Sequence, residues 1–132
     1  MKNIYKLKAF SLIEMMVVLT IIVILTALTA PNFSNQIKTT RRTEAKTSLL
    51  DYAMRFEEYY GTNFSYTNAD TYYGLSTQPQ TENGYYRLTA NITDSGNSYT
   101  ITATAIGSQA SDTNCSTITI NNIGEKTPTN CW

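Results

Sequence analysis

A single acidic residue, Glu14, lies inside an otherwise apolar segment, and its carboxylate is the first group whose chemistry needs an explanation. The segment runs from Phe10 to Ala30, and Lys6 and Lys8 precede it. A charge within a lipid-soluble segment is costly unless a cation reaches the same depth, so such residues are functional by default. Ser11 and Glu14 also match a capping box, in which the two side chains bond the free amides of a helix start. Capping boxes lie in water, whereas this one begins an apolar run, so we expect a cationic partner for Glu14.

Cleavage between Ala9 and Phe10 would create that cation. Before cleavage the Phe10 nitrogen is a neutral amide, and afterwards it is an α-amine that is largely protonated near neutral pH. The amine lies four residues from Glu14 in its own helix and is equally available to Glu14 of a neighbouring subunit. Two such segments packed side by side would neutralise each other. This predicts an assembly device whose register is set by a buried charge pair.

The rest of the chain offers little for catalysis. It has no histidine, the commonest general base, and no glycine loop that would cradle a phosphate. Its carboxylates show no metal-ligand spacing, and Glu57 and Glu58 are adjacent, so they project from different parts of a helix surface. The sequence therefore predicts no catalytic residue, no metal site, no cofactor and no enzymatic activity.

Two cysteines, Cys115 and Cys131, lie near the C-terminus. A zinc site needs about four ligands, and without histidine these two thiols would need unusual help. Buried free thiols are another alternative. The N-terminal export segment indicates an oxidising compartment and favours a disulfide, which would stabilise the fold by roughly 3 kcal/mol in the chain-entropy model.

The apolar segment has the length of a membrane anchor. As a helix, residues 10–30 would extend about 32 Å, close to the thickness of a bilayer's hydrocarbon core. The lysines at its short leading side predict a cytoplasmic N-terminus, with everything after Ala30 outside. A cleaved secretory signal is a competing interpretation, but Leu28 and Pro31 fit its small-x-small cleavage site poorly. A plain signal anchor stays open on hydropathy alone.

The start of the chain resembles the class III leader of type IV pilins. The basic leader, Phe10, the spaced Glu14, the apolar run and Pro31 all agree with that pattern. The resemblance implies that prepilin peptidase cuts between Ala9 and Phe10, that Phe10 becomes N-methylated, and that Glu14 is the assembly glutamate. Ala9 replaces the glycine usual before the cut, and Val23 stands where many members have a helix-loosening glycine.

The C-terminal stretch NCSTITINNIGEKTPTNCW, residues 114–132, resembles the Cys-bounded end of PilE-like minor pilins. Together the two resemblances imply a minor subunit of a type IV pilus that assembles by helix packing and contributes to adhesion, twitching motility or DNA uptake. The implied partners are other pilin subunits, prepilin peptidase, the inner-membrane assembly machinery and, before assembly, the membrane. The implied location is the bacterial inner membrane for the precursor, with its C-terminus in the periplasm, and then the extracellular pilus. A DNA-uptake receptor and a type II secretion pseudopilin are the alternatives.

Periodicity predicts an α+β chain, the class to which the pilin fold belongs. An apolar stripe at helical spacing continues past Pro31, which predicts one helix from about Phe10 to Tyr60, kinked at Pro31 and ended by Gly61. The stripe consists of Leu49, Ala53, Phe56 and Tyr60, with Leu50 and Met54 alongside. We divide the chain into a leader (1–9), a hydrophobic helix that anchors the precursor and forms the filament core (10–30), an amphipathic half of the same helix (31–60) and a globular head (61–132).

The head should contain an antiparallel sheet of three or more strands. Residues 61–83 have little periodicity and are predicted to form a long exposed loop. After them, apolar residues alternate in three runs, of which the first two are joined by a Gly/Asn turn, as in a hairpin. The inward positions are Tyr86, Leu88, Ala90 and Ile92, then Tyr99, Ile101, Ala103 and Ala105, then Ile118 and Ile120. We expect one face of the sheet to cover the helix stripe, with the disulfide pinning its C-terminal edge.

Charge is distributed unevenly along the chain, although the formal total is zero. Residues 51–132 hold three basic groups against eight acids, a net charge of −5. Phosphate binding requires a basic footprint, so this balance disfavours DNA as a partner even though nine of the ten tyrosines lie between Tyr52 and Tyr99. Four cations just before the head are predicted to form a solvated collar near filament neighbours or lipid headgroups. They are Lys38, Arg41, Arg42 and Lys46.

Overall fold

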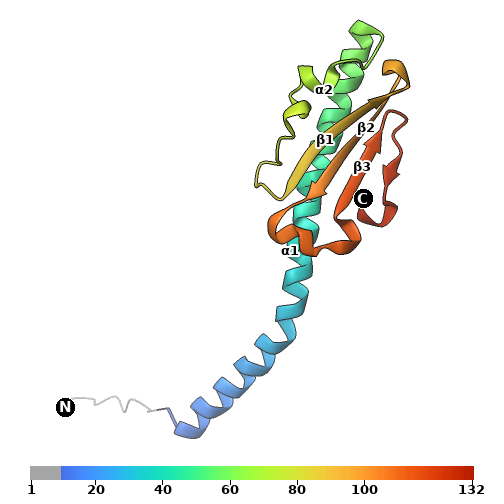
Figure 1. Cartoon of the computed structure of the whole chain (residues 1–132). Coiled ribbons are helices and arrows are strands. Elements are labelled where there is room, and N and C mark those ends of the chain that lie inside the picture. The colour runs from blue at the N-terminus through green and yellow to red at the C-terminus, as the bar shows by residue number, and fades with distance from the viewer. Residues whose placement is uncertain (1–9) are drawn as a thin grey trace, which may run out of the picture. The chain divides into compact units, whose positions relative to one another are not determined.

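We describe residues 10–132 of a computed structural model, apart from the side chains of residues 28–32. The chain forms one long helix, one short helix and a four-stranded antiparallel sheet, joined by 3₁₀ turns (Figure 1). The elements are α1 (Leu12–Asn63), α2 (Ala69–Tyr72), β1 (Tyr86–Thr93), β2 (Ser98–Ala105), β3 (Thr117–Asn121) and β4 (Lys126–Thr127). The α+β class and the sheet of three or more strands are confirmed. The chain divides into two compact units, residues 1–36 and 37–132, which we describe separately.

The first unit is described from Phe10 on and contains the beginning of α1. The amides of Glu14 and Met15 donate to the Ser11 carbonyl at 3.0 and 3.2 Å. Large apolar side chains from Leu12 to Leu25 are 46–78% exposed, on all sides of the helix. Within the described part of the chain, we find no helix whose length and apolarity would let it span a membrane. The leader, with Ala9, lies outside the described residues, as does the Pro31 side chain, so the kink stays a prediction.

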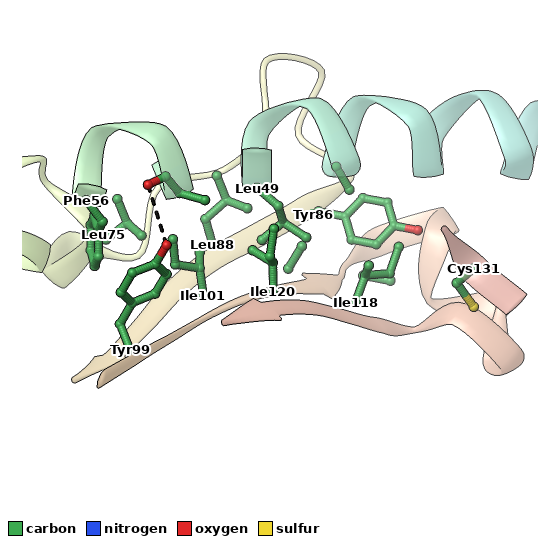
Figure 2. Close-up of a cluster of buried hydrophobic side chains, with 14 of the residues drawn as sticks. Leu49, Phe56, Leu75, Tyr86, Leu88, Tyr99, Ile101, Ile118, Ile120 and Cys131 are labelled. Carbon is green, nitrogen blue, oxygen red and sulfur yellow. Dashed lines mark hydrogen bonds between the residues drawn. The ribbon is translucent and has the colours of Figure 1, made fainter. Parts of the chain in front are cut away.

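In the second unit, α1 turns one stripe toward the sheet. Ala45, Leu49, Ala53 and Phe56 are buried along it, as a helical repeat requires. Figure 2 shows the labelled side chains of this core between the helix and the sheet. The predicted amphipathic stripe is therefore present, but it is narrower than predicted, because Leu50 and Met54 are 40% and 66% exposed.

The helix ends later than predicted. It passes through Gly61 to Asn63, and the Phe64 amide still donates to the Tyr60 carbonyl at 2.8 Å. Phe64 itself has φ +55°, the left-handed conformation that closes many helices. A single glycine costs only about 1 kcal/mol inside a helix, so Gly61 does not stop a helix that the neighbouring turns continue.

The sheet has the order β1-β2-β3-β4, and its register brings the predicted inward residues together. Leu88 faces Ala103, which in turn faces Ile118, and Ala90 faces Ile101, which faces Ile120. Most of these side chains are buried, while Ala90 and Ile92 are half-buried against the same core. The alternation read from the sequence therefore gives the correct face for each strand.

The segment before the sheet is more ordered than the predicted exposed loop. Tyr66, Ala69, Leu75 and Thr81 are buried, and α2 lies within it. The Tyr66 amide donates to the carbonyl of Gly96, in the β1–β2 turn, at 2.7 Å. Isolated apolar residues between turns, without a repeat, hold this segment to the head, and for that reason periodicity does not reveal it.

The C-terminal region is closed by a disulfide. Cys115 and Cys131 are buried, with Sγ atoms 1.96 Å and Cα atoms 5.7 Å apart. The bond joins the turn before β3 to the last turn of the chain, after β4. The pairing that the sequence favours is present in the structure.

Candidate functional site

The outer face of the sheet, which points away from α1, is lined by hydroxyl and amide side chains. Register places them in rows across the strands: Arg87, Thr104 and Thr117; Thr89, Thr102, Thr119 and Thr127; Asn91, Thr100 and Asn121; Thr93 and Ser98. The hydroxyls of Thr119 and Thr127 bond each other at 2.6 Å. Among these described strand positions Arg87 is the one charged residue, and the nearby Glu125 carboxylate accepts a hydrogen bond from the Asn121 amide at 3.0 Å.

Arg87 is the cation of this outer face. It is exposed on β1, next to Thr104 of β2. Lys126 is exposed on the edge strand β4, but it pairs with the inward residue Ile120, so it belongs to the opposite face of the sheet. Its ammonium lies 4.9 Å from the centre of the Trp132 ring, and the Trp132 indole N–H donates to the Thr127 carbonyl at 3.4 Å. The outer face can therefore donate many hydrogen bonds and offers one positive charge, which suits an anionic polymer better than a catalytic reaction.

The sequence predicted a solvated basic collar on α1, but three of its four cations contact the head. They bond the turn Gly107–Ser111 (η3) and the residue after it, Asp112. Lys38 donates to the Ser111 carbonyl at 3.3 Å, and Arg41 donates to the Ser108 hydroxyl at 3.0 Å. The Arg41 guanidinium also lies 3.9 Å from the centre of the Tyr85 ring. These side chains fasten the connection between β2 and β3 to the helix.

The strongest of these contacts is the pair between Arg42 and Asp112. The guanidinium Nε and Nη2 donate to the two carboxylate oxygens, each at 2.6 Å. Asp112 is 5% exposed and also accepts from the Gln109 amide at 3.0 Å. The hydrogen bonds from Arg42, helped by its charge, hold the pKa of Asp112 below its usual range, although burial opposes the shift. Asp112 is therefore neutralised and does not repel an anion from the head.

Acidic groups gather instead around the end of α1. Glu57 accepts hydrogen bonds from the hydroxyls of Tyr66 and Tyr99, with the shortest distances 3.0 Å for both. Burial, and then the bond to Glu57, raises the pKa of Tyr66 to about 12 and also raises the pKa of Tyr99. Figure 2 shows the Tyr99 hydroxyl pointing from β2 toward the helix. Asp51 pairs with Arg55 at 2.9 Å. These acids lie on the helix and away from the outer face of the sheet.

The residues singled out for assembly lie in the first unit. Phe10 is 71% exposed, and Glu14 lies in the first turn of α1. Ala9 is outside the described residues, so the geometry of the cleavage site is not part of the structure. Within residues 10–132, no cluster of three or more Cys, Asp or Glu side chains could hold a metal ion.

Sequence reasoning did not single out the outer-face residues. The signal was present in the polar positions of "SYTITATA" and "TITIN", which alternate with the apolar positions that predicted the strands. Threonine is common in strands for its β propensity alone, so its repetition did not indicate a surface of functional interest. The register is needed to see that the residues form continuous rows.

Comparisons with known proteins agree with this architecture. A family model described as "Type IV minor pilin ComP, DNA uptake sequence receptor" matches residues 31–119, and a model of the prokaryotic N-terminal methylation motif matches residues 6–30. A solved type IV pilin from Shewanella oneidensis is similar, with 25% identity and a TM-score of 0.57 over 72% of this chain and 97% of that one. None of the curated proteins is significantly similar in sequence. Because the first match covers more than half of the sequence, the chain belongs to the type IV minor pilin family that this description names.

Proposed function

We propose that this minor pilin is a DNA receptor that contacts the phosphate backbone of DNA with the outer face of its sheet. The family match over residues 31–119 carries the proposal, because the description of that family names a DNA uptake sequence receptor. The outer face fits this role, since most contacts to nucleic-acid backbones come from arginine and lysine and from Ser, Thr and Asn side chains. Its rows of hydroxyls supply such donors, with Arg87 among them.

The family match favours the DNA-uptake alternative, whereas the charge balance of the sequence disfavoured DNA as a partner. That expectation treated all residues from 51 to 132 as one acidic body. The structure separates the charges, because Asp112 is neutralised by Arg42, Asp51 pairs with Arg55, and Glu57 binds two tyrosine hydroxyls. The field at the outer face depends on the charges nearest to it, since exposed charges more than about 10 Å away are screened at moderate ionic strength.

The precursor stage of the proposal follows the leader. We propose that the N-terminus of the precursor is cytoplasmic, that its C-terminus is periplasmic, and that prepilin peptidase cuts between Ala9 and Phe10. The methylation-motif match over residues 6–30 supports this cut. The new Phe10 amine would then pair with Glu14 of a neighbouring subunit during assembly in the inner membrane. Intact mass should show the loss of residues 1–9, a methyl group on Phe10 and two missing thiol hydrogens.

Filter binding tests the receptor role. Double-stranded DNA and the full mature chain in detergent would be mixed at two salt concentrations. With Arg87 as the cation on the phosphates, affinity should fall roughly threefold between about 50 and 200 mM salt. Replacing Arg87 by alanine should remove most of the binding and most of this salt dependence. The same binding by this variant as by the unchanged chain would rule out the outer face.

Arg55→Ala is the matched control. Arg55 is also an exposed arginine of the head, but it pairs with Asp51 on the helix and does not lie on the sheet. Its removal should leave retention of DNA unchanged at both salt concentrations. An equal loss of binding in this control would mean that any positive charge on the head suffices and that the outer face has no special part.

A further inference from the structure

A surface cavity of about 390 Å³ lies between the end of α1 and α2, at the acidic end of the head. It is lined by Glu58, Tyr59, Thr62, Asn63, Tyr72 and Tyr73. Figure 1 shows α2 beside the last turns of α1. None of these residues belongs to the outer face of the sheet, so the cavity plays no part in the proposed contact with DNA.

The three tyrosine rings around the cavity stand at steep angles to one another. The centre of the Tyr72 ring is 5.4 Å from that of Tyr59 and 4.9 Å from that of Tyr73, with interplanar angles of 53° and 88°. Tyr59 and Tyr73 are 6.3 Å apart at 72°. Rings at such angles face different directions, and so can present more than one π-face or edge to a single small group.

Two of the rings are fixed by the fold, and the third is open to solvent. The Tyr59 hydroxyl donates to the Thr67 carbonyl at 3.0 Å, and Tyr73 stacks on the buried Phe56 with ring centres 6.2 Å apart. Tyr72 is 72% exposed. The site is therefore partly preformed, which lowers the entropy cost of binding.

The charge at the cavity is negative. Glu58 lines the cavity together with Tyr73. Burial, and next the Glu58 carboxylate, raises the pKa of Tyr73. Among the described residues, Glu58 has no ion pair. The Arg55 guanidinium lies 5.9 Å from the centre of the Tyr73 ring and is itself paired with Asp51. A phosphate would be repelled here, whereas a cation would gain from both the carboxylate and the ring faces.

We infer that this cavity binds a quaternary ammonium group, recognised by the faces of its tyrosine rings and by the carboxylate of Glu58. Aromatic rings with a nearby acid suit such a cation, because it is large, weakly hydrated and unable to donate strong hydrogen bonds. Attraction to a ring face acts within about 6 Å of the ring centre. The volume exceeds that of a trimethylammonium group, so a substituent of the ligand can extend out of the cavity.

Titration with choline, followed by NMR of the tyrosine rings in the full mature chain in detergent, tests the inference. We expect a dissociation constant on the order of 1 mM, with the largest shifts at the rings of Tyr59, Tyr72 and Tyr73. The neutral isostere 3,3-dimethylbutanol has the same shape without the charge and should bind at least about fivefold more weakly. Equal binding of the two, equal binding of glucose, or no binding of choline would overturn the inference.

Two variants and one control locate the site. Tyr72→Ala should weaken choline binding about fivefold, and Glu58→Gln about threefold; both side chains are exposed, so the head should still fold. Phe64→Leu changes another exposed aromatic residue near the end of α1 that does not line the cavity, and it should leave choline binding unchanged. If choline binds normally to both Tyr72→Ala and Glu58→Gln, the cavity is not its site.

Binding to vesicles of two lipid compositions shows whether the ammonium group belongs to a lipid headgroup or to a soluble ligand. Stronger retention on phosphatidylcholine than on phosphatidylglycerol vesicles, lost in Tyr72→Ala, supports the inference with a lipid headgroup as ligand. Binding of choline without such retention supports it with a soluble ligand. DNA binding should be unchanged in Tyr72→Ala, so this test and the test of the DNA receptor can fail independently.

Discussion

The pair of Arg42 and Asp112 shows how one buried carboxylate fastens the β2–β3 connection to the helix. Asp112 is nearly inaccessible, whereas Arg42 keeps part of its side chain in solvent. Removing one partner of a buried pair leaves the other without compensation and costs more than the pair itself contributes. The contact is therefore a sensitive point for the stability of the head.

Asp112→Asn should lower the free energy of unfolding of the head by about 3 kcal/mol near neutral pH. Its matched control is Asp51→Asn, which removes an exposed pair to arginine and should cost less than about 1 kcal/mol. Urea denaturation followed by circular dichroism would measure both. Equal effects of the two substitutions would contradict the importance of burial at Asp112.

The same pair predicts a pH dependence. Because Arg42 lowers the pKa of Asp112 in the folded state, the stabilisation is complete above the ordinary pKa of about 4. It is lost as pH falls through the lower folded value, since protonation removes the charge on which the pair depends. The unchanged chain should therefore lose more stability than Asp112→Asn when urea denaturation is repeated at pH values from about 5 down to 2.

The tyrosines bound to Glu57 make the stability of the fold depend on pH at the alkaline end, where it should fall as pH rises. The pKa of Tyr66 is raised from its ordinary value of 10 to about 12, so the neutral hydroxyl stabilises the fold fully below pH 10 and loses this effect as pH rises toward 12. Glu57→Gln should lower the pKa of Tyr66 and Tyr99, because the charge that opposes tyrosinate is gone, while burial still keeps both above the ordinary value. Site-resolved NMR titration would measure the shift. Asp70→Asn is the control, and it should leave both values unchanged.

At the scale of elements, the β1–β2 turn depends on one glycine. Gly96 has φ +90°, and its carbonyl accepts from the Tyr66 amide at 2.7 Å. A Cβ at this position would collide with the hydroxyl oxygens of Ser65 and Thr67. The segment after α1 and the tip of the hairpin can therefore approach each other only when residue 96 has no side chain.

Gly96→Ala should destabilise the head by about 2 kcal/mol, from left-handed strain and the collision together. Gly61→Ala is its counterpart, because Gly61 lies inside α1 and a Cβ there meets no heavy atom of the described residues within 4 Å. That substitution should raise the free energy of unfolding by about 0.5–1 kcal/mol. Thermal unfolding of both variants would show shifts of opposite sign, and shifts of equal sign would contradict this account.

Elements with a repeat could be predicted from the sequence, and elements without one could not. The strand faces followed from alternation, and the buried face of α1 followed from residues such as Leu49 and Phe56. The segment from Phe64 to Tyr85 lacks any period, since single residues such as Leu75 and Tyr66 hold it by long-range contacts. The disulfide was predicted because the export segment indicates an oxidising compartment and because the sequence has too few ligands for a zinc site. The rows on the outer face and the tyrosine cavity depend on strand register and tertiary packing, which no local pattern encodes.

At the scale of the whole molecule, the two units have separate tasks. The chain is a type IV minor pilin with a methylation motif at its start, a class of protein made as a membrane-anchored precursor and then assembled with other pilins. The head buries a core of its own between α1 and the sheet. The apolar residues of the first unit, in contrast, remain exposed in a single chain, as expected of a surface that neighbouring subunits cover in a filament.

This separation makes a prediction about Glu14. In Glu14→Gln the head should fold normally, because it has a hydrophobic core of its own. Incorporation into pili should fall strongly, because the proposed partner of the Phe10 amine is lost. Thr20→Val is the matched control, since Thr20 is a second polar residue of the same segment whose hydroxyl already donates to the Met16 carbonyl at 2.7 Å. Mass spectrometry of sheared pili would quantify each chain. Normal incorporation of Glu14→Gln, or an equal loss in Thr20→Val, would show that apolar packing alone directs assembly.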